Sequence, residues 1–364
     1  MQTSLRKLLV VLIGLLVLGF VVYQSSGFIR NANFSGAKLL SAVRGANLSL
    51  LLLSIAAIYA CYALRSLRWQ VFQQNLGVSR FWTIYKITLA GFSAVFILGR
   101  AGEPVRPLLL ARKEHLPAAD MFGIYALERL FDTASAAVIA GIALLLFQSH
   151  AHVGETSSSL ETAARTAGTL LFAGVGCAIA FLVYLRVHGT AFLERRLQVW
   201  RTSHGWRAKT ANIILGFARG VQTIRSWGEL ALTVAYSTAH WFLVLLVYVW
   251  VSHSFGGTLG TLSIGDAMLV MAFTLVGSVV QLPAVGGGSQ LASLLVYTKV
   301  FGVETEAATA ASIVLWLISF AACSLAGVPL LIHEGFSLGQ LRELAEHEKE
   351  AAGAVVPRPG EPAP

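Results

Sequence analysis

The sequence is short of charge. Only 12% of its 364 residues are charged, whereas soluble domains carry roughly 25%. Its hydrophobic share is 56%. This scarcity excludes a soluble globular protein and predicts that lipid covers much of the surface. The 27 Lys and Arg exceed the 18 Asp and Glu. Basic loops beside an anionic leaflet explain that excess, and we expect no nucleic-acid partner because no soluble domain is there to hold one.

Signatures of common enzymes and metal sites are missing as well. There is no Gly-x-x-x-x-Gly-Lys-Ser/Thr, no His-Glu-x-x-His, and no Gly-x-Ser-x-Gly set on a strand-turn-helix. The three cysteines, Cys61, Cys177 and Cys323, lie in separate apolar segments without CxxC spacing, which indicates small buried side chains. The sequence therefore predicts no cofactor and no metal site.

Long apolar runs are what the sequence has in quantity. A membrane-spanning helix needs about 20 mostly apolar residues. Six runs are suited to this role: Leu8–Tyr23, Ala46–Leu64, Met121–Phe147, Gly168–Leu185, Leu230–Val251 and Ala308–Ile332. The first is read as an uncleaved span, because Gln24–Gly27 is a poor cleavage site. The predicted fold class is all-α, a polytopic transmembrane helix bundle.

Two further apolar runs are broken by glycine and proline. Phe81–Leu98 meets the run Gly99–Pro104 before it resumes, and Ala267–Leu282 meets Pro283–Gly288 before Leu291–Phe301. Irregular backbone at membrane depth is tolerated only against protein or a water-filled cavity. We therefore predict two hairpins, either re-entrant or made of two short crossings, in addition to about six full spans.

Basic residues near the membrane favour the cytoplasmic side. The segment Arg186–Glu229 is rich in Arg and Lys, which places it in the cytoplasm, either as amphipathic helices on the membrane surface or as a plain connector. Gln148–Ala167 and His253–Asp266 have almost no basic residues and are expected outside. Other basic residues predict cytoplasmic positions for the N-terminus and the second loop: Arg6, Lys7, Arg65, Arg68 and Arg80.

This topology gives the two hairpins opposite orientations, as in transporters with broken helices. The outside loop Asn31–Gly45 fits poorly, since it is basic. An internal duplication, in which Gly102 and Gly286 correspond, and two unrelated glycine-rich kinks both stay open. We expect a transmembrane domain over residues 1–335 and a polar, largely disordered cytoplasmic tail over 336–364. Both termini would be cytoplasmic, and the location would be the cell inner membrane.

Ionisable residues gather around the first hairpin. Six of them are the strongest site candidates: Arg100, Glu103, Arg106, Glu128, Arg129 and Asp132. A charge inside hydrocarbon costs about 2.5–3.5 kcal/mol on insertion scales, so such groups pair or line a polar cavity. Arg100 and Arg106 are the expected partners of the two acids at 128 and 132. The network either only locks the hairpin to the span, or it also keeps arginines available for a phosphate.

The second hairpin offers backbone N–H groups rather than charged side chains. Its candidates, with Gly102 of the first hairpin, are Pro283, Gly286, Gly287, Gly288 and Gln290. Exposed glycine backbone can present N–H groups to an anion, although a packing contact between small residues explains it equally well. His240, in an otherwise apolar span, is either a satisfied core histidine or a proton relay.

These motifs resemble the transmembrane region of lysylphosphatidylglycerol synthases, a family that includes stand-alone flippase-like proteins. The resemblance rests on Leu98–Arg106 (LGRAGEPVR), Ala126–Asp132 (ALERLFD) and Leu282–Gly288 (LPAVGGG). It implies a polytopic bundle with re-entrant elements that moves lipid between leaflets. By position it carries over the six charged candidates, with Pro283, Gly286 and Gly287.

Two departures from the family pattern stand out. The family commonly has Pro where this chain has Gly99, and its second motif often has a later Glu where this chain continues with Ser289 and Gln290. The missing acid leaves the charge preference for substrate open. No aminoacyl-transferring domain is expected after Ile332, so the chain should not make lysyl lipid by itself.

The sequence thus predicts a lipid translocase for a phosphate-bearing headgroup. Arg100 and Arg106 would bind phosphate, Glu128 and Asp132 would hold or release them, and the glycine hairpin would be the opposing gate. The expected partners are membrane lipids, an anionic phospholipid or a lipid phosphate, and a homo-oligomer is left open. The alternatives are an intramembrane transferase on lipid-linked substrates, with Glu128 or Asp132 as base, and a membrane scaffold or partner subunit.

Overall fold

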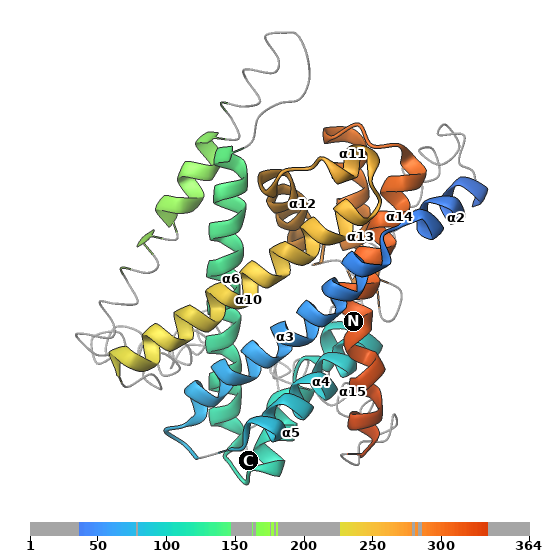
Figure 1. The fold of residues 1–364 in the computed structure, drawn as a ribbon. Coiled ribbons are helices and arrows are strands. Elements are labelled where there is room, and N and C mark those ends of the chain that lie inside the picture. Colours follow the sequence, from blue (N-terminus) through green and yellow to red (C-terminus); the bar gives the residue numbers. More distant parts are fainter. Residues whose placement is uncertain are drawn as a thin grey trace, which may run out of the picture.

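A computed structural model describes residues 36–77, 79–146, 162, 165–174, 176–177, 180, 226–278, 281–282 and 286–333. The described part is a polytopic helical bundle, which confirms the predicted fold class (Figure 1). Within it, five helices are long and apolar enough to cross a membrane: Leu48–Gln73, Phe81–Leu98, Asp120–Leu146, Trp227–Ser254 and Thr305–His333.

Four predicted spans correspond to these helices. They are α3 (Leu48–Gln73), α6 (Ala118–Leu146), α10 (Trp227–Ser254), and the continuous unit of α14 (Thr305–Trp316), η3 (Leu317–Ala321) and α15 (Ala322–His333). The predicted span Leu8–Tyr23 lies outside the described residues. So do most of the segment Arg186–Glu229 and the tail 336–364. Within the predicted span Gly168–Leu185 the structure describes residues 168–174, 176–177 and 180, and all of them are helical. Residues 165–167, just before this span, are helical as well.

Helices α3 and α10 run antiparallel and side by side (Figure 1). At one end the side chain of Asn47 caps α3 by accepting from Ser49 and Leu50 N–H groups, and its own N–H donates to the Ser254 carbonyl at 2.7 Å. At the other end Asn75 Nδ2 donates to Glu229 Oε2 at 3.2 Å. Polar contacts at both ends therefore help to fix the register of the helix pair.

The first broken run is a helical hairpin, as predicted. It consists of α4 (Phe81–Leu98), the 3₁₀ turn η1 (Gly99–Gly102) and α5 (Val105–Lys113). At Gly102 a Cβ would lie 2.3 Å from the Ala94 carbonyl oxygen, so only glycine lets the tip fold back onto α4. Nine residues make α5 about 14 Å long, against a hydrocarbon thickness of about 30 Å. The α5 arm is therefore too short to cross the hydrocarbon by itself.

The second broken run is built differently. It comprises α12 (Ile264–Gly277), β1 (Gln281–Leu282), β2 (Gly286–Gly287), α13 (Gly288–Leu295) and the π-helical turn η2 (Val296–Val300). The two short strands pair antiparallel across the tip. At the base of the tip a Cβ on Gly277 would lie 2.3 Å from the Gly288 carbonyl oxygen, so the helices approach closely through glycine.

The two hairpins enter from opposite ends of α6. The chain passes from α5 to the start of α6 within a few residues, and the Leu116 N–H donates to the Ala111 carbonyl. The start of α12 instead lies at the far end of α6, where Gly265 comes near Leu146. The tips meet, since β1 contacts η1. The predicted opposite orientation is confirmed.

The remaining described helices close the bundle. Gly327 lets α15 pack against α4, since a Cβ there would lie 2.2 Å from the Leu89 carbonyl oxygen. Part of the predicted loop Asn31–Gly45 is a helix, α2 (Gly36–Gly45), which packs on α14; Lys38 Nζ donates to Glu304 Oε1 at 2.9 Å. The short helix α11 (Gly257–Gly260) joins α10 to α12.

Candidate functional site

Two carboxylates on α6 form the centre of the site. Glu128 and Asp132 lie one turn apart on one face, and Glu128 is fully buried. Helix α6 begins at Ala118, which places Asp132 about 21 Å along it at 1.5 Å per residue. Because α6 has 29 residues, this position is close to its middle, where an uncompensated charge costs most.

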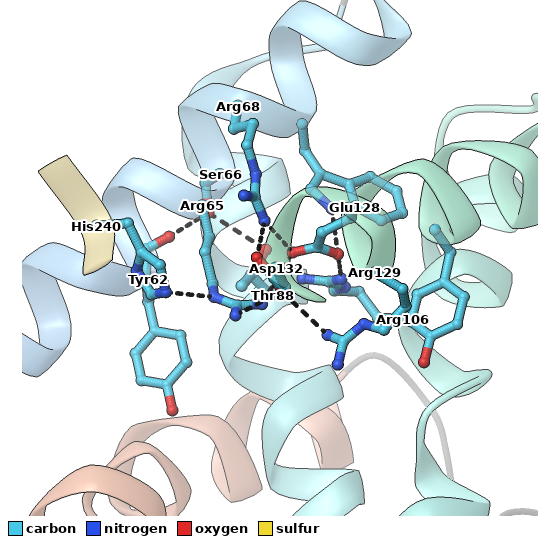
Figure 2. Close-up of polar contacts among 12 residues, drawn as sticks. Tyr62, Arg65, Ser66, Arg68, Thr88, Arg106, Glu128, Arg129, Asp132 and His240 are labelled. Atoms are coloured by element: carbon cyan, nitrogen blue, oxygen red, sulfur yellow. Dashed lines mark hydrogen bonds and ion pairs between the residues drawn. The ribbon is translucent and has the colours of Figure 1, made fainter. Parts of the chain in front are cut away.

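Two arginines from α3 neutralise these acids (Figure 2). Arg65 donates to Glu128 Oε1 at 2.9 Å and to Asp132 Oδ2 at 2.8 Å. Arg68 Nη2 lies 3.1 Å from Glu128 Oε1 and 2.8 Å from Asp132 Oδ1. The prediction that both arginines lie in a cytoplasmic loop is wrong, because α3 continues to Gln73 and buries them.

The first hairpin joins the network through Arg106. Its Nη2 donates to Glu128 Oε2, which also accepts from Trp69 Nε1 at 2.8 Å. The guanidinium carbon of Arg106 lies 4.5 Å from the Trp69 ring centroid and 5.3 Å from that of Phe92. This contact agrees with the predicted pairing of Arg106 with the acids. Gly91 permits it, since a Cβ at that position would lie 2.5 Å from Arg106 Cβ.

Helix α10 closes the far side of the network. Arg65 Nε donates to His240 Nε2 at 3.3 Å, so that nitrogen is the acceptor and the imidazole is neutral. Arg68 Nη1 donates to Ser237 at 2.9 Å. The network therefore ties α3, α5, α6 and α10 together, and His240 belongs to it as a buried acceptor.

A cavity of about 150 Å³ adjoins the network. Nine of the described residues line it: Gly91, Phe92, Val95, Glu103, Arg106, Tyr125, Arg129, Ser278 and Phe320. They come from both arms of the first hairpin, from α6, from the end of α12 and from the π-helical turn η3. Turns of π-helix inside longer helices are frequent at functional sites, and Phe320 is the residue that η3 directs here.

Two arginines line this cavity, and each also carries a buried nitrogen without an acceptor among the described residues. Arg106 is almost fully buried, and its Nη1 has no acceptor among the described residues. Arg129 Nε is buried and likewise has none there. The ion pair of Arg129 with Asp132 spans 3.8 Å, which is too long for a hydrogen bond. A buried donor without a partner costs about 1–3 kcal/mol, so the described residues do not fully satisfy these two guanidinium groups.

The carboxylate of Glu103 lies on the wall of the same cavity. Its Oε2 accepts from the Tyr125 hydroxyl, and the guanidinium of Arg129 lies 5.1 Å from the Tyr125 ring centroid. The Tyr125 side chain thus contacts both the Glu103 carboxylate and the Arg129 guanidinium. The wall of the cavity therefore carries negatively and positively charged side chains.

The predicted site residues fall into five groups. Glu103, Arg106 and Arg129 line the cavity, whereas Glu128 and Asp132 lie in the network beside it. Gly102 packs on α4. Gly286, Gly287, Gly288 and Gln290 form the second tip, where Gln290 accepts from the Gly287 N–H, and none of these four lines the cavity. The side chain of Arg100 and the whole of Pro283 lie outside the described residues.

Sequence reasoning missed Arg65, Arg68 and Trp69. Their spacing, i, i+3 and i+4, puts them on one helical face, and the apolar run continues past them to Val71 and Phe72. That continuation was the available signal for a longer helix. Nothing in the sequence indicated Ser278 or Phe320, which reach the cavity through tertiary packing.

Comparisons with known proteins identify the family. A family model described as "Lysylphosphatidylglycerol synthase TM region" matches residues 7–327. Comparison with curated proteins and with solved structures gave no match. The matched range includes both hairpins, α3, α6, α10 and the whole charged network.

Proposed function

We propose that this chain, which belongs to the lysylphosphatidylglycerol synthase transmembrane-region family, moves a lipid with a phosphate-bearing headgroup between leaflets. The family makes it an integral membrane protein related to lipid modification or translocation. The observation that carries the finer proposal is that two guanidinium groups, of Arg106 and Arg129, line one cavity and are not fully paired with the described residues. Guanidinium groups suit phosphate oxygens because their donors match the geometry of phosphate.

The balance of charge supports an anionic ligand. The network and cavity together hold four arginines, at 65, 68, 106 and 129, and three carboxylates, at 103, 128 and 132. His240 is neutral, so one positive charge is left over among these described side chains. An excess charge in a low-dielectric site is costly, and a bound phosphate would offset it.

The size of the cavity supports a headgroup rather than a whole lipid. Its volume of about 150 Å³ is below the roughly 300–1,000 Å³ of pockets that enclose a drug-sized ligand. A headgroup fits such a space while the acyl chains stay in the bilayer. The polar site would then supply the compensating charge that a headgroup needs while it crosses hydrocarbon.

The arrangement of Glu128 speaks against the transferase alternative. Its two oxygens accept from Arg65, Arg68, Trp69 and Arg106. A carboxylate stabilised by so many donors is a poor base. Holding the arginines in place is the role that this geometry favours.

The experiment is a transport assay on the purified full chain in vesicles that contain an anionic phospholipid with a fluorescent acyl chain. Arg106→Gln and Arg129→Gln should each slow exchange between leaflets at least about tenfold, because a hydrogen bond to a charged group is worth about 1.5–3 kcal/mol. Arg112→Gln is the matched control, since Arg112 is exposed on the same short helix. Equal rates for all four proteins would contradict the proposal. The inner-membrane location and the cytoplasmic termini stay predictions.

A further inference from the structure

Glu103 is the one acid among the described residues that line the cavity. We propose that Glu103 limits the ligand to a single negative charge, so that the site takes a phosphodiester headgroup and rejects a phosphomonoester dianion. This inference rests on the proposed function and names the substrate class of the same cavity. Glu103 is a specificity-determining residue in this account.

The carboxylate of Glu103 keeps its charge effective toward the cavity. No Lys or Arg among the described residues lies within ion-pair distance of it, and its hydrogen-bond partner there is the neutral hydroxyl of Tyr125. Arg106 instead donates to Glu128, and Arg129 lies over the Tyr125 ring. The two cavity arginines therefore attract an anion while an unneutralised acid beside them repels excess negative charge.

The net charge of the described side chains of the network and cavity sets the limit on the charge of the ligand. Four arginines and three carboxylates leave one positive charge among the described side chains of the network and cavity. A phosphodiester carries one negative charge and cancels it. A phosphomonoester gains a second negative charge above its second pKa of about 6, and that charge would face Glu103 without a further guanidinium. Like charges brought together at a binding site cost several kcal/mol, which is enough for selection.

The test compares two lipids that share one fluorescent acyl chain, phosphatidylglycerol as the phosphodiester and phosphatidic acid as the phosphomonoester. The full chain is reconstituted as wild type, Glu103→Gln and Glu114→Gln. Glutamine has the shape of glutamate and can still accept from Tyr125, so Glu103→Gln removes charge alone. Glu114 lies on the same hairpin but does not line the cavity, which makes it the matched control.

Wild type should move phosphatidylglycerol faster than phosphatidic acid at a pH of about 9, above the second phosphate pKa of about 6. Glu103→Gln should raise the rate ratio of phosphatidic acid to phosphatidylglycerol about tenfold, since one repulsion is lost. Glu114→Gln should leave the ratio unchanged. At a pH of about 5, where both headgroups carry one charge, the effect of Glu103→Gln on the ratio should be much smaller.

The outcomes separate the two proposals. A wild type that moves phosphatidylglycerol, with a ratio that Glu103→Gln leaves unchanged, overturns the role of Glu103 and leaves the proposed function standing. If Glu103→Gln changed the rate ratio by the same factor at both pH values, that result would also overturn the role of Glu103. Such a change would not depend on the second charge of the phosphomonoester. A wild type that moves neither lipid contradicts the proposed function itself. Retention of the two lipids by the same purified variants, measured by native mass spectrometry, gives the ratio independently of transport rates.

Discussion

The two broken hairpins share a helix-break-helix design, but different forces hold them. The first is tied to α6 by the ion pair of Arg106 with Glu128, and to α3 by the packing of Arg106 over the Trp69 ring. The second is surrounded by neutral hydroxyls: Tyr248 bonds Thr274 at 2.6 Å, and Ser252 bonds Tyr297 at 2.8 Å. Breaking a neutral hydrogen bond costs far less than separating a buried ion pair. We therefore expect the charged hairpin to hold the ligand and the neutral hairpin to be the part that moves.

The hydrophobic contacts follow the same division. One cluster of buried residues includes Trp69, Ile84, Leu110 and Met121, and it packs the first hairpin against α3 and α6. A second cluster surrounds α10, α12 and α14. The tips of the hairpins meet where η1 contacts β1. The difference teaches that charged and neutral contacts are divided between two halves whose hairpin tips touch.

The largest effect is expected from Glu128→Gln. The substitution removes one of two carboxylates that neutralise Arg65, Arg68 and Arg106, and breaking a buried ion pair from one side costs about 3–5 kcal/mol. Thermal unfolding of the purified protein in detergent measures it, as a clear fall in Tm. An unchanged Tm would show that the network adds no stability to the first hairpin and would remove the contrast with the second.

A smaller loss is expected from Gly277→Ala in the second hairpin. The new Cβ would lie 2.3 Å from the Gly288 carbonyl oxygen, and overpacking of this kind costs about 1–3 kcal/mol. Gly123→Ala in α6 is the control, because a Cβ there meets nothing within 4 Å, and alanine favours helix by about 1 kcal/mol. The same Tm for both variants would show that α12 and α13 do not pack as closely as described.

Tyr297→Phe should cost about 0.5–1.5 kcal/mol, the value of one neutral hydrogen bond. Ser252 keeps its bond to the Tyr248 carbonyl, so no hydroxyl is left without a partner. The measurement is thermal unfolding of Tyr297→Phe and Glu128→Gln under the same conditions, and the two falls in Tm compare the contacts of the two hairpins directly. A loss as large as that of Glu128→Gln would mean that neutral and charged contacts hold them equally.

The smallest effect is expected at the exposed pair of Lys38 and Glu304. Lys38→Met should leave Tm unchanged at neutral pH, because exposed ion pairs contribute little. The hydrogen bond that Lys38 donates to the Glu304 carboxylate raises the pKa of Lys38 above its ordinary 10.5. A raised pKa stabilises the fold below the ordinary value and stops doing so as pH rises through the folded value. Any difference between the proteins should therefore vanish in strong alkali, and one that grows there would contradict the assignment.

The fold was largely predictable because the lengths of the apolar runs, and the glycines that interrupt them, can be read directly from the sequence. The helices at α3, α6, α10 and α14–α15, and both hairpins, follow from runs of apolar residues that Gly99–Pro104 and Pro283–Gly288 interrupt. Gly99 has a φ of +65°, which proline cannot adopt because its ring fixes φ near −65°. The departure from the family pattern at this position therefore changes how the first tip turns.

The site was only half predictable. Glu128, Arg106 and Arg129 stand out because charge within an apolar run is rare. Arg65 and Arg68 do not, because basic residues at the end of a span normally belong to a cytoplasmic loop. Only packing against α6 and α10 shows that they point inward. Of the two arginines first expected to bind phosphate, Arg106 lines the cavity, and the second unused donor there belongs to Arg129.

The central claim is that two spare guanidinium groups bind a lipid phosphate. Native mass spectrometry of the full chain, released from gentle detergent, tests it without a transport assay. Wild type and Arg112→Gln should retain a phosphate-bearing lipid, whereas Arg129→Gln, whose arginine side chain is 40% exposed and should be replaceable without unfolding, should lose most of it. Equal retention of the same lipid by all three proteins would contradict the claim.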